Sequence, residues 1–309
     1  MEHLADEKQN NDDYKYCNTL SDQTNRSYRS TWNLFVQFCS SRSVNSLAAP
    51  GEIIAAFISN LADIGKSPGT ITKSLSAIYH CKKVSGYPIS TDTMLYIASV
   101  VEGITRKAVV LQKNKRNIAT ISPEMLKKMV DTLGNTMVDK RDKAFLLVSF
   151  AGMFHRSEIA ALRHEDIFNT EGGLILRVKH LRVNKEYEKF LEQTDSPYCP
   201  VHALLEWILI ANIKEGPVFR SIKYGRVSNN SIEPSSLPII VKRIAKLAGF
   251  NPSLVSTNSL REGAILTAIE NGISPLIIAA QSGDQYINTI YRKKKKSTKN
   301  LINPIRGAL

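Results

Sequence analysis

Apolar side chains recur every three to four residues over residues 22–103, which is the spacing of amphipathic helices. Glycines break the pattern between helices, as at Gly65 and Gly86. Four helices are predicted in this way, over 22–39, 53–65, 67–85 and 91–103. They predict a compact helical domain over 21–104. The polar segment 1–20 is expected to be disordered.

A second patterned region begins at Ser122 and Pro123, which together form a helix start. The helix predicted over 142–151 is almost entirely apolar, so we expect it at the centre of a second domain. The run 174–178 predicts a strand, with a hairpin through Asn184. Further helices are predicted over 200–213, 235–248, 260–270 and 274–281. The predicted fold class is mainly α with a small β-sheet.

The segment between these regions, 105–121, has weak periodicity and many cations. The whole chain carries 41 lysines and arginines against 28 acidic residues, a formal charge of +13. Such an excess indicates a polyanionic partner, most simply duplex DNA. We interpret 105–121 as a basic linker that lies along a phosphate backbone, while a solvated loop would have the same composition. The linker cations assigned to DNA are Arg106, Lys107, Lys113, Lys115 and Arg116.

Cysteine spacing and hydropathy argue against other classes of protein. The four cysteines have no metal-site spacing, so we expect no metal and interpret them as reduced thiols in a cytosolic or nuclear compartment. The first residues hold no apolar signal-peptide core, and no apolar run approaches membrane-spanning length. We therefore expect no membrane partner.

Two arginines distant in sequence, Arg156 and Arg261, each lie at the start of an apolar helical run. The planar guanidinium binds phosphate oxygens in a bidentate manner and keeps its charge at every physiological pH. In a strongly basic chain, this pair indicates a clamp for a phosphate.

The sequence around these arginines resembles the tyrosine recombinase (phage integrase) family. GMFHRSEIAALRHEDI, residues 152–167, resembles the segment with the family's first catalytic arginine, and NSLREGAILTAIENGISPLIIAAQSG, residues 258–283, resembles the segment with the second. The resemblance extends from about Ser21 to Arg306. It implies that 21–104 is a core-binding domain. It also implies that 122–309 is a catalytic domain with a basic C-terminal segment.

In this family a tyrosine hydroxyl attacks a DNA phosphate, which forms a 3′-phosphotyrosyl link and releases a free 5′-hydroxyl, with no metal or other cofactor. The resemblance implies that Arg156 and Arg261 are the catalytic arginines and that Glu158 is the buried acid supporting the first. Preorganised cations of this kind supply several kcal/mol of barrier lowering.

The chain departs from the family pattern at three positions. Asn258 stands where the family has histidine, Asp284 stands where it has histidine or tryptophan, and Lys293 stands where it has the nucleophilic tyrosine. The basic residue of the hairpin is assigned to Lys179, with Lys185 as the second choice.

These departures weaken the chemistry. Asn258 donates a hydrogen bond but does not exchange a proton at neutral pH. A carboxylate at Asp284 repels a phosphate by roughly 4 kcal/mol at about 4 Å and an effective dielectric of 20. Alternatively, Asp284 pairs with Arg261, or it caps the next helix and points away.

Tyr291 is the alternative nucleophile. In a helix it lies about 200° around the axis from Lys293, so only a shifted register or a non-helical segment would bring it into place. Otherwise it is a packing or DNA-contacting aromatic. The basic run after it is interpreted as phosphate-contacting, with a solvated tail as the alternative. The remaining DNA contacts are assigned to Lys293, Lys294, Lys295, Arg29 and Lys73.

Three functions follow from this interpretation. The first is a recombinase-derived protein that binds duplex DNA with weak or no strand cleavage. The second is an active site-specific recombinase that uses Tyr291. The third is a non-catalytic partner that assembles with an active recombinase paralogue; a homo-oligomer on DNA fits the family as well.

Overall fold

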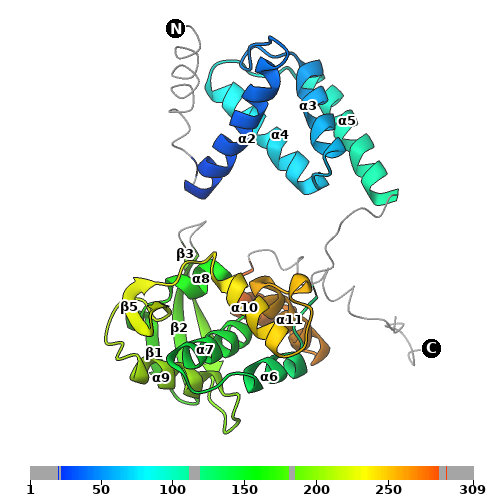
Figure 1. Ribbon diagram of the computed structural model, residues 1–309. Coiled ribbons are helices and arrows are strands. Elements are labelled where there is room, and N and C mark those ends of the chain that lie inside the picture. The colour runs from blue at the N-terminus through cyan, green and yellow to red at the C-terminus, as the bar shows by residue number, and fades with distance from the viewer. Residues whose placement is uncertain (1–19, 21, 111–118, 181–184, 285–289, 291–309) are drawn as a thin grey trace, which may run out of the picture. The chain divides into compact units, whose positions relative to one another are not determined.

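The computed structural model describes residues 20, 22–110, 119–180, 185–284 and 290 (Figure 1). The chain divides into two compact units, Met1–Lys115 and Arg116–Leu309. The division falls within the segment predicted to be a linker. Helices dominate both units, and strands occur only in the second among the described residues, so the predicted mainly α class with a small sheet is confirmed. No helix in the described ranges is long and apolar enough to cross a membrane.

The described residues of the first unit form four helices, which begin close to the positions that the sequence predicts. Their bounds are α2 (Asp22–Ser40), α3 (Gly51–Asp63), α4 (Pro68–Val84) and α5 (Thr91–Val110). Each helix buries one apolar face in a shared core that includes Phe35, Phe57 and Ile78. The rings of Phe35 and Phe57 meet edge to face, with 5.3 Å between their centroids.

Helix α5 continues to Val110, beyond the predicted end at residue 103. Two contacts support the extra turns. Arg106 pairs with Glu102 one turn earlier at 3.0 Å, and Thr105 Oγ1 donates to the carbonyl of Val101 at 2.8 Å. Side-chain pairs four residues apart stabilise exposed helix. The first residues of the predicted linker are therefore helical.

In the second unit, the described residues form helices and two small antiparallel sheets. The helices are α6 (Pro123–Asp131), α7 (Met137–Ala151), α8 (Arg156–Ala161), α9 (Pro200–Ile210), α10 (Leu237–Leu247), α11 (Thr257–Glu270) and α12 (Pro275–Ser282), with 3-10 turns at His164–Asp166 and Pro252–Leu254. The strands are β1 (Ile167–Thr170), β2 (Gly173–His180), β3 (Lys185–Glu192), β4 (Arg220–Lys223) and β5 (Arg226–Ser231). Strands β1, β4 and β5 were not predicted, because they are short and only partly buried.

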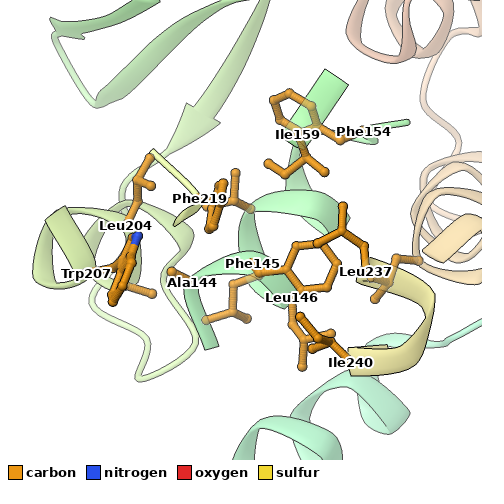
Figure 2. Close-up of a cluster of buried hydrophobic side chains, with 14 of the residues drawn as sticks. Ala144, Phe145, Leu146, Phe154, Ile159, Leu204, Trp207, Phe219, Leu237 and Ile240 are labelled. Atoms are coloured by element: carbon orange, nitrogen blue, oxygen red, sulfur yellow. The ribbon is translucent and has the colours of Figure 1, made fainter. Parts of the chain in front are cut away.

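Helix α7 lies at the centre of this unit, as its apolar sequence predicts. Figure 2 shows Phe145 and Leu146 of α7 between Trp207 of α9 on one side and Ile240 of α10 on the other. The helix begins earlier than predicted, because Thr136 and Asp139 form a capping box ahead of it. This buried helix supports the loop that leads to Arg156.

Strand β3 carries an unusual residue on its buried face. In the three-stranded sheet, β2 is central, and its Leu176 lies opposite Lys189 of β3. Alternate residues of a strand share a face, so Lys189 lies on the same side as the buried Leu191. A lysine therefore lies on the buried face of the sheet, where apolar side chains are usual.

Candidate functional site

A cavity of about 180 Å³ opens where the N-terminal ends of α8 and α11 meet. None of the described residues that line it is acidic. They are Phe154, His155, Arg156, Pro238, Ser256, Thr257 and Asn258. The cavity thus brings together two of the predicted site residues, Arg156 and Asn258.

The loop that carries Arg156 to the cavity has a constrained backbone. Met153 has a φ of 50°, a left-handed conformation that non-glycine residues rarely adopt. A side chain at the preceding Gly152 would lie 2.4 Å from the Phe154 ring, so glycine is required there. The carbonyl of Met153 accepts hydrogen bonds from Arg261 Nη1 and Lys189 Nζ. Two cations therefore hold the strained turn in place.

Arg261 is buried beneath this loop, with 2% of its surface exposed. Its Nη1 also donates to the carbonyl of Ser282 at 2.7 Å, and its Nη2 donates to Asp284 Oδ1 at 2.8 Å. The other carboxylate oxygen of Asp284 accepts from Ser282 Oγ at 3.1 Å. Of the alternatives for Asp284, the structure shows the ion pair with Arg261.

Lys189 is a second buried cation in the same region, and the sequence interpretation missed it. It has no exposed surface, and its Nζ donates to the carbonyl of Gln281 at 2.7 Å. The Oε2 atom of Glu158 lies 3.9 Å from this nitrogen, and the rings of Phe154 and Tyr187 lie about it. Burial lowers the pKa of Lys189 to about 7, although the charge of Glu158 opposes the shift.

Alternation along β3 was the signal that could have revealed Lys189. Tyr187, Lys189 and Leu191 lie two residues apart, so they share the face that Leu191 buries. Glu158, which the resemblance implies is a supporting acid, is itself buried and accepts from the backbone N–H of His155 at 2.9 Å. We call Arg261, Lys189, Glu158 and the partly exposed Asp284 the buried ion cluster.

His155 connects the cavity with the buried ion cluster. The residue lines the cavity and is exposed there, yet desolvation of the ring and then the charge of Arg261 lower the pKa of His155 to about 4. The imidazole is therefore neutral near pH 7. A neutral imidazole can donate one hydrogen bond and accept another.

The two predicted arginines occupy different environments. Arg156 is exposed at the cavity, whereas Arg261 is buried and is not among the described residues that line it. No hydrogen bond or ion pair among the described residues joins the two side chains. Arg261 is linked to the cavity through Met153, the carbonyl of which it binds.

The remaining predicted residues lie elsewhere or outside the described residues. Lys179 is exposed and pairs with Glu186 of the neighbouring strand at 3.3 Å. Lys73 is exposed on α4, and Lys107 and Arg29 are exposed on α5 and α2. Outside the described residues lie Tyr291, Lys293, Lys294, Lys295, Lys113, Lys115 and Arg116, and so does the side chain of Lys185.

The cavity offers donors to an anion. Arg156 supplies a guanidinium, Asn258 an amide and Thr257 a hydroxyl, and the first turn of α11 presents backbone N–H groups. This set suits one tetrahedral oxyanion, because every group can donate a hydrogen bond and the net charge is positive.

Sequence relatives agree with the resemblance. No protein-family model matches the chain. An integrase/recombinase xerD homolog of Selenomonas ruminantium is 29% identical over 283 residues, which cover 88% of this chain and 81% of the relative. Transposase A from transposon Tn554 of Staphylococcus aureus is 25% identical over 184 residues, which cover 58% of this chain and about half of that protein, 49%.

Solved structures share the fold. The lambda integrase(75-356) dimer bound to a COC' core site has a TM-score of 0.66 at 14% identity, and the match covers 93% of both chains. The XerH site-specific recombinase bound to difH has a TM-score of 0.62 at 14% identity, with 92% of this chain and 77% of that chain covered. The relative that matches over most of both chains and this shared fold confirm that the chain resembles the tyrosine recombinase family.

Proposed function

We propose that this protein binds duplex DNA as a member of the tyrosine recombinase family and that its strand-cleaving activity is impaired. The observation that carries the proposal is the ion pair between Arg261 and Asp284, because it engages the arginine that the resemblance assigns to the reacting phosphate. The cavity beside it keeps Arg156 available for phosphate contact.

Binding is supported by charge. The chain has a formal charge of +13, and the exposed cations of the first unit include Lys73 and Lys107. Several structural neighbours, among them the lambda integrase dimer and XerH, are complexes with DNA. By analogy with these complexes, we propose that the present chain binds the DNA backbone with both units and that two copies assemble on one DNA.

Impaired cleavage is supported by electrostatics. A phosphate that approaches Arg261 must compete with the carboxylate of Asp284, which lies 2.8 Å away from Nη2. Asn258 at the cavity supplies a donor but no proton-transfer group near neutral pH. The proposed pocket therefore holds a phosphate better than it activates one.

An active recombinase is the second candidate. It is favoured by the names of the sequence relatives, an integrase/recombinase and a transposase. In this reading Tyr291 is the nucleophile, and Asp284 leaves Arg261 when DNA binds.

A salt titration tests the binding part of the proposal. Affinity for a short duplex DNA is measured by fluorescence anisotropy at increasing salt. If about six phosphates are contacted, the logarithm of affinity falls against the logarithm of salt with a slope of about five. An affinity that does not change with salt would contradict DNA as the main partner.

A further inference from the structure

Thr257 is a buried residue with an unused hydroxyl. It is the first residue of α11, and only 3% of its surface is exposed. Its Oγ1 is buried, yet within the described part of the chain this oxygen has no hydrogen-bond partner. An unpaired hydroxyl in a buried position costs free energy, so such an atom calls for an explanation.

Helix capping does not explain this hydroxyl. The N-cap position of α11 belongs to Ser256, the backbone N–H of which donates to Ser259 Oγ at 3.0 Å. Thr257 lies one residue further, inside the helix, where a side chain is not positioned to cap the first turn. A valine of nearly the same shape would fill the site without leaving a polar atom unpaired.

The surroundings of Thr257 indicate an anion. The residue lines the cavity together with Arg156 and Asn258, and none of the described lining residues carries a negative charge. Helix α11 is 14 residues long. The N–H of Ser259 donates to Ser256 ahead of the helix, while those of Thr257 and Asn258 have no partner within the helix. Its N-terminus therefore favours negative charge. A single oxyanion would accept from the hydroxyl, the helix end and Arg156 together.

We propose that the Thr257 hydroxyl is a direct ligand of a phosphate oxygen of bound DNA. This inference rests on the proposed function and adds to it a binding residue that is neutral. Because a hydroxyl releases no counterions, its contribution to DNA affinity is independent of salt, unlike that of a lysine or arginine. This property separates Thr257 from every cation on the surface.

The test uses the matched variants Thr257→Val and Thr257→Ser in the full chain. Affinity for a short duplex DNA is measured at several salt concentrations, and urea unfolding is measured without DNA. Thr257→Val should bind about tenfold more weakly at every salt, with the slope of the wild type. Its unfolding free energy should equal or exceed that of the wild type. Thr257→Ser, which keeps the hydroxyl, should bind within about twofold of the wild type.

Three outcomes are informative. If the DNA affinity of the wild type does not change with salt concentration, both the proposed function and this inference are wrong. Salt-dependent binding that Thr257→Val leaves unchanged overturns only the role of Thr257. A loss of affinity in Thr257→Val that is matched by a loss of folding stability also overturns it, because the hydroxyl would then support the fold rather than the ligand.

Discussion

The cavity and the buried ion cluster lie side by side, yet they use their polar groups in opposite ways. In the cluster, Arg261 and Lys189 donate to carbonyl groups of the protein itself, and Asp284 and Glu158 lie close to these cations. At the cavity, Arg156 is exposed and Thr257 Oγ1 has no partner in the described residues.

A site that cleaves DNA must both hold its own backbone in place and bind a phosphate. Here the two tasks belong to different residues. Buried charges with protein partners fix a backbone, and here they fix the turn at Met153 and the end of α12. Donors without a protein partner, such as those at the cavity, can bind a ligand. The contrast therefore predicts that substitutions in the cluster change stability first, whereas substitutions at the cavity change DNA affinity first.

Arg261→Ala should have the largest effect. It removes three hydrogen bonds of a buried guanidinium and leaves Asp284 without its cation. Breaking a buried pair in this way costs about 3–5 kcal/mol of unfolding free energy. Urea denaturation followed by circular dichroism measures the loss. A change within about 0.5 kcal/mol would mean that Arg261 is not part of the supporting structure.

Lys189→Met should change how folding stability depends on pH. The folded-state pKa of Lys189, about 7, is below its unfolded value of 10.5, so the unfolded chain binds more protons between these values. Wild-type stability should therefore rise with pH from about 7 towards 10.5, by at most about 1.4 kcal/mol per pH unit from this group.

The methionine variant lacks this titration, so the difference in stability between wild type and Lys189→Met should change with pH over the same range. Unfolding at pH 7, 8 and 9 provides the measurement. Parallel curves for the two proteins would show that Lys189 does not lose its charge there.

Asp284→Asn should raise DNA affinity about tenfold, because it removes the negative charge that competes with phosphate for Arg261. Because Asp284 belongs to the buried ion cluster, the unfolding free energy should also fall, but by less than in Arg261→Ala, since the amide keeps the size of the side chain and can still accept from Arg261. Glu171→Gln, which removes an exposed negative charge of the same unit, is the matched control for charge. Equal effects of the two variants would attribute the gain to net charge alone.

Arg156→Ala should have the smallest effect on folding, within about 0.5 kcal/mol, since the side chain is exposed. Its DNA affinity should fall, and the magnitude of the salt slope should decrease by about 0.9, because one phosphate contact is lost. Lys179→Ala, which removes an exposed cation paired with Glu186, is the comparison. If the salt slope of Arg156→Ala equals that of the wild type, Arg156 does not contact a DNA phosphate.

The sequence predicts the parts of this account that depend on local pattern. The four helices of the first unit follow from apolar spacing, and the central position of α7 follows from its nearly uniform apolar composition. The pairing of Asp284 with Arg261 was one of the alternatives that the sequence left open, and the structure selects it.

Other parts depend on tertiary contacts and could not be predicted in this way. The left-handed turn at Met153 is held by cations from β3 and α11, which are remote in sequence. Lysine side chains are normally exposed, but Lys189 is buried, because carbonyl groups and Glu158 compensate its charge. The unpaired hydroxyl of Thr257 becomes visible only when the cavity is formed.

Trapping a covalent protein–DNA adduct shows directly whether this protein cleaves DNA. A nicked duplex substrate that prevents religation is incubated with wild type, Tyr291→Phe and the double variant Lys293→Tyr with Asp284→His. Wild type should give little or no adduct, and the double variant, which restores both a tyrosine and a donor, should give more. An abundant adduct from wild type that Tyr291→Phe abolishes would contradict impaired cleavage and establish the active recombinase instead.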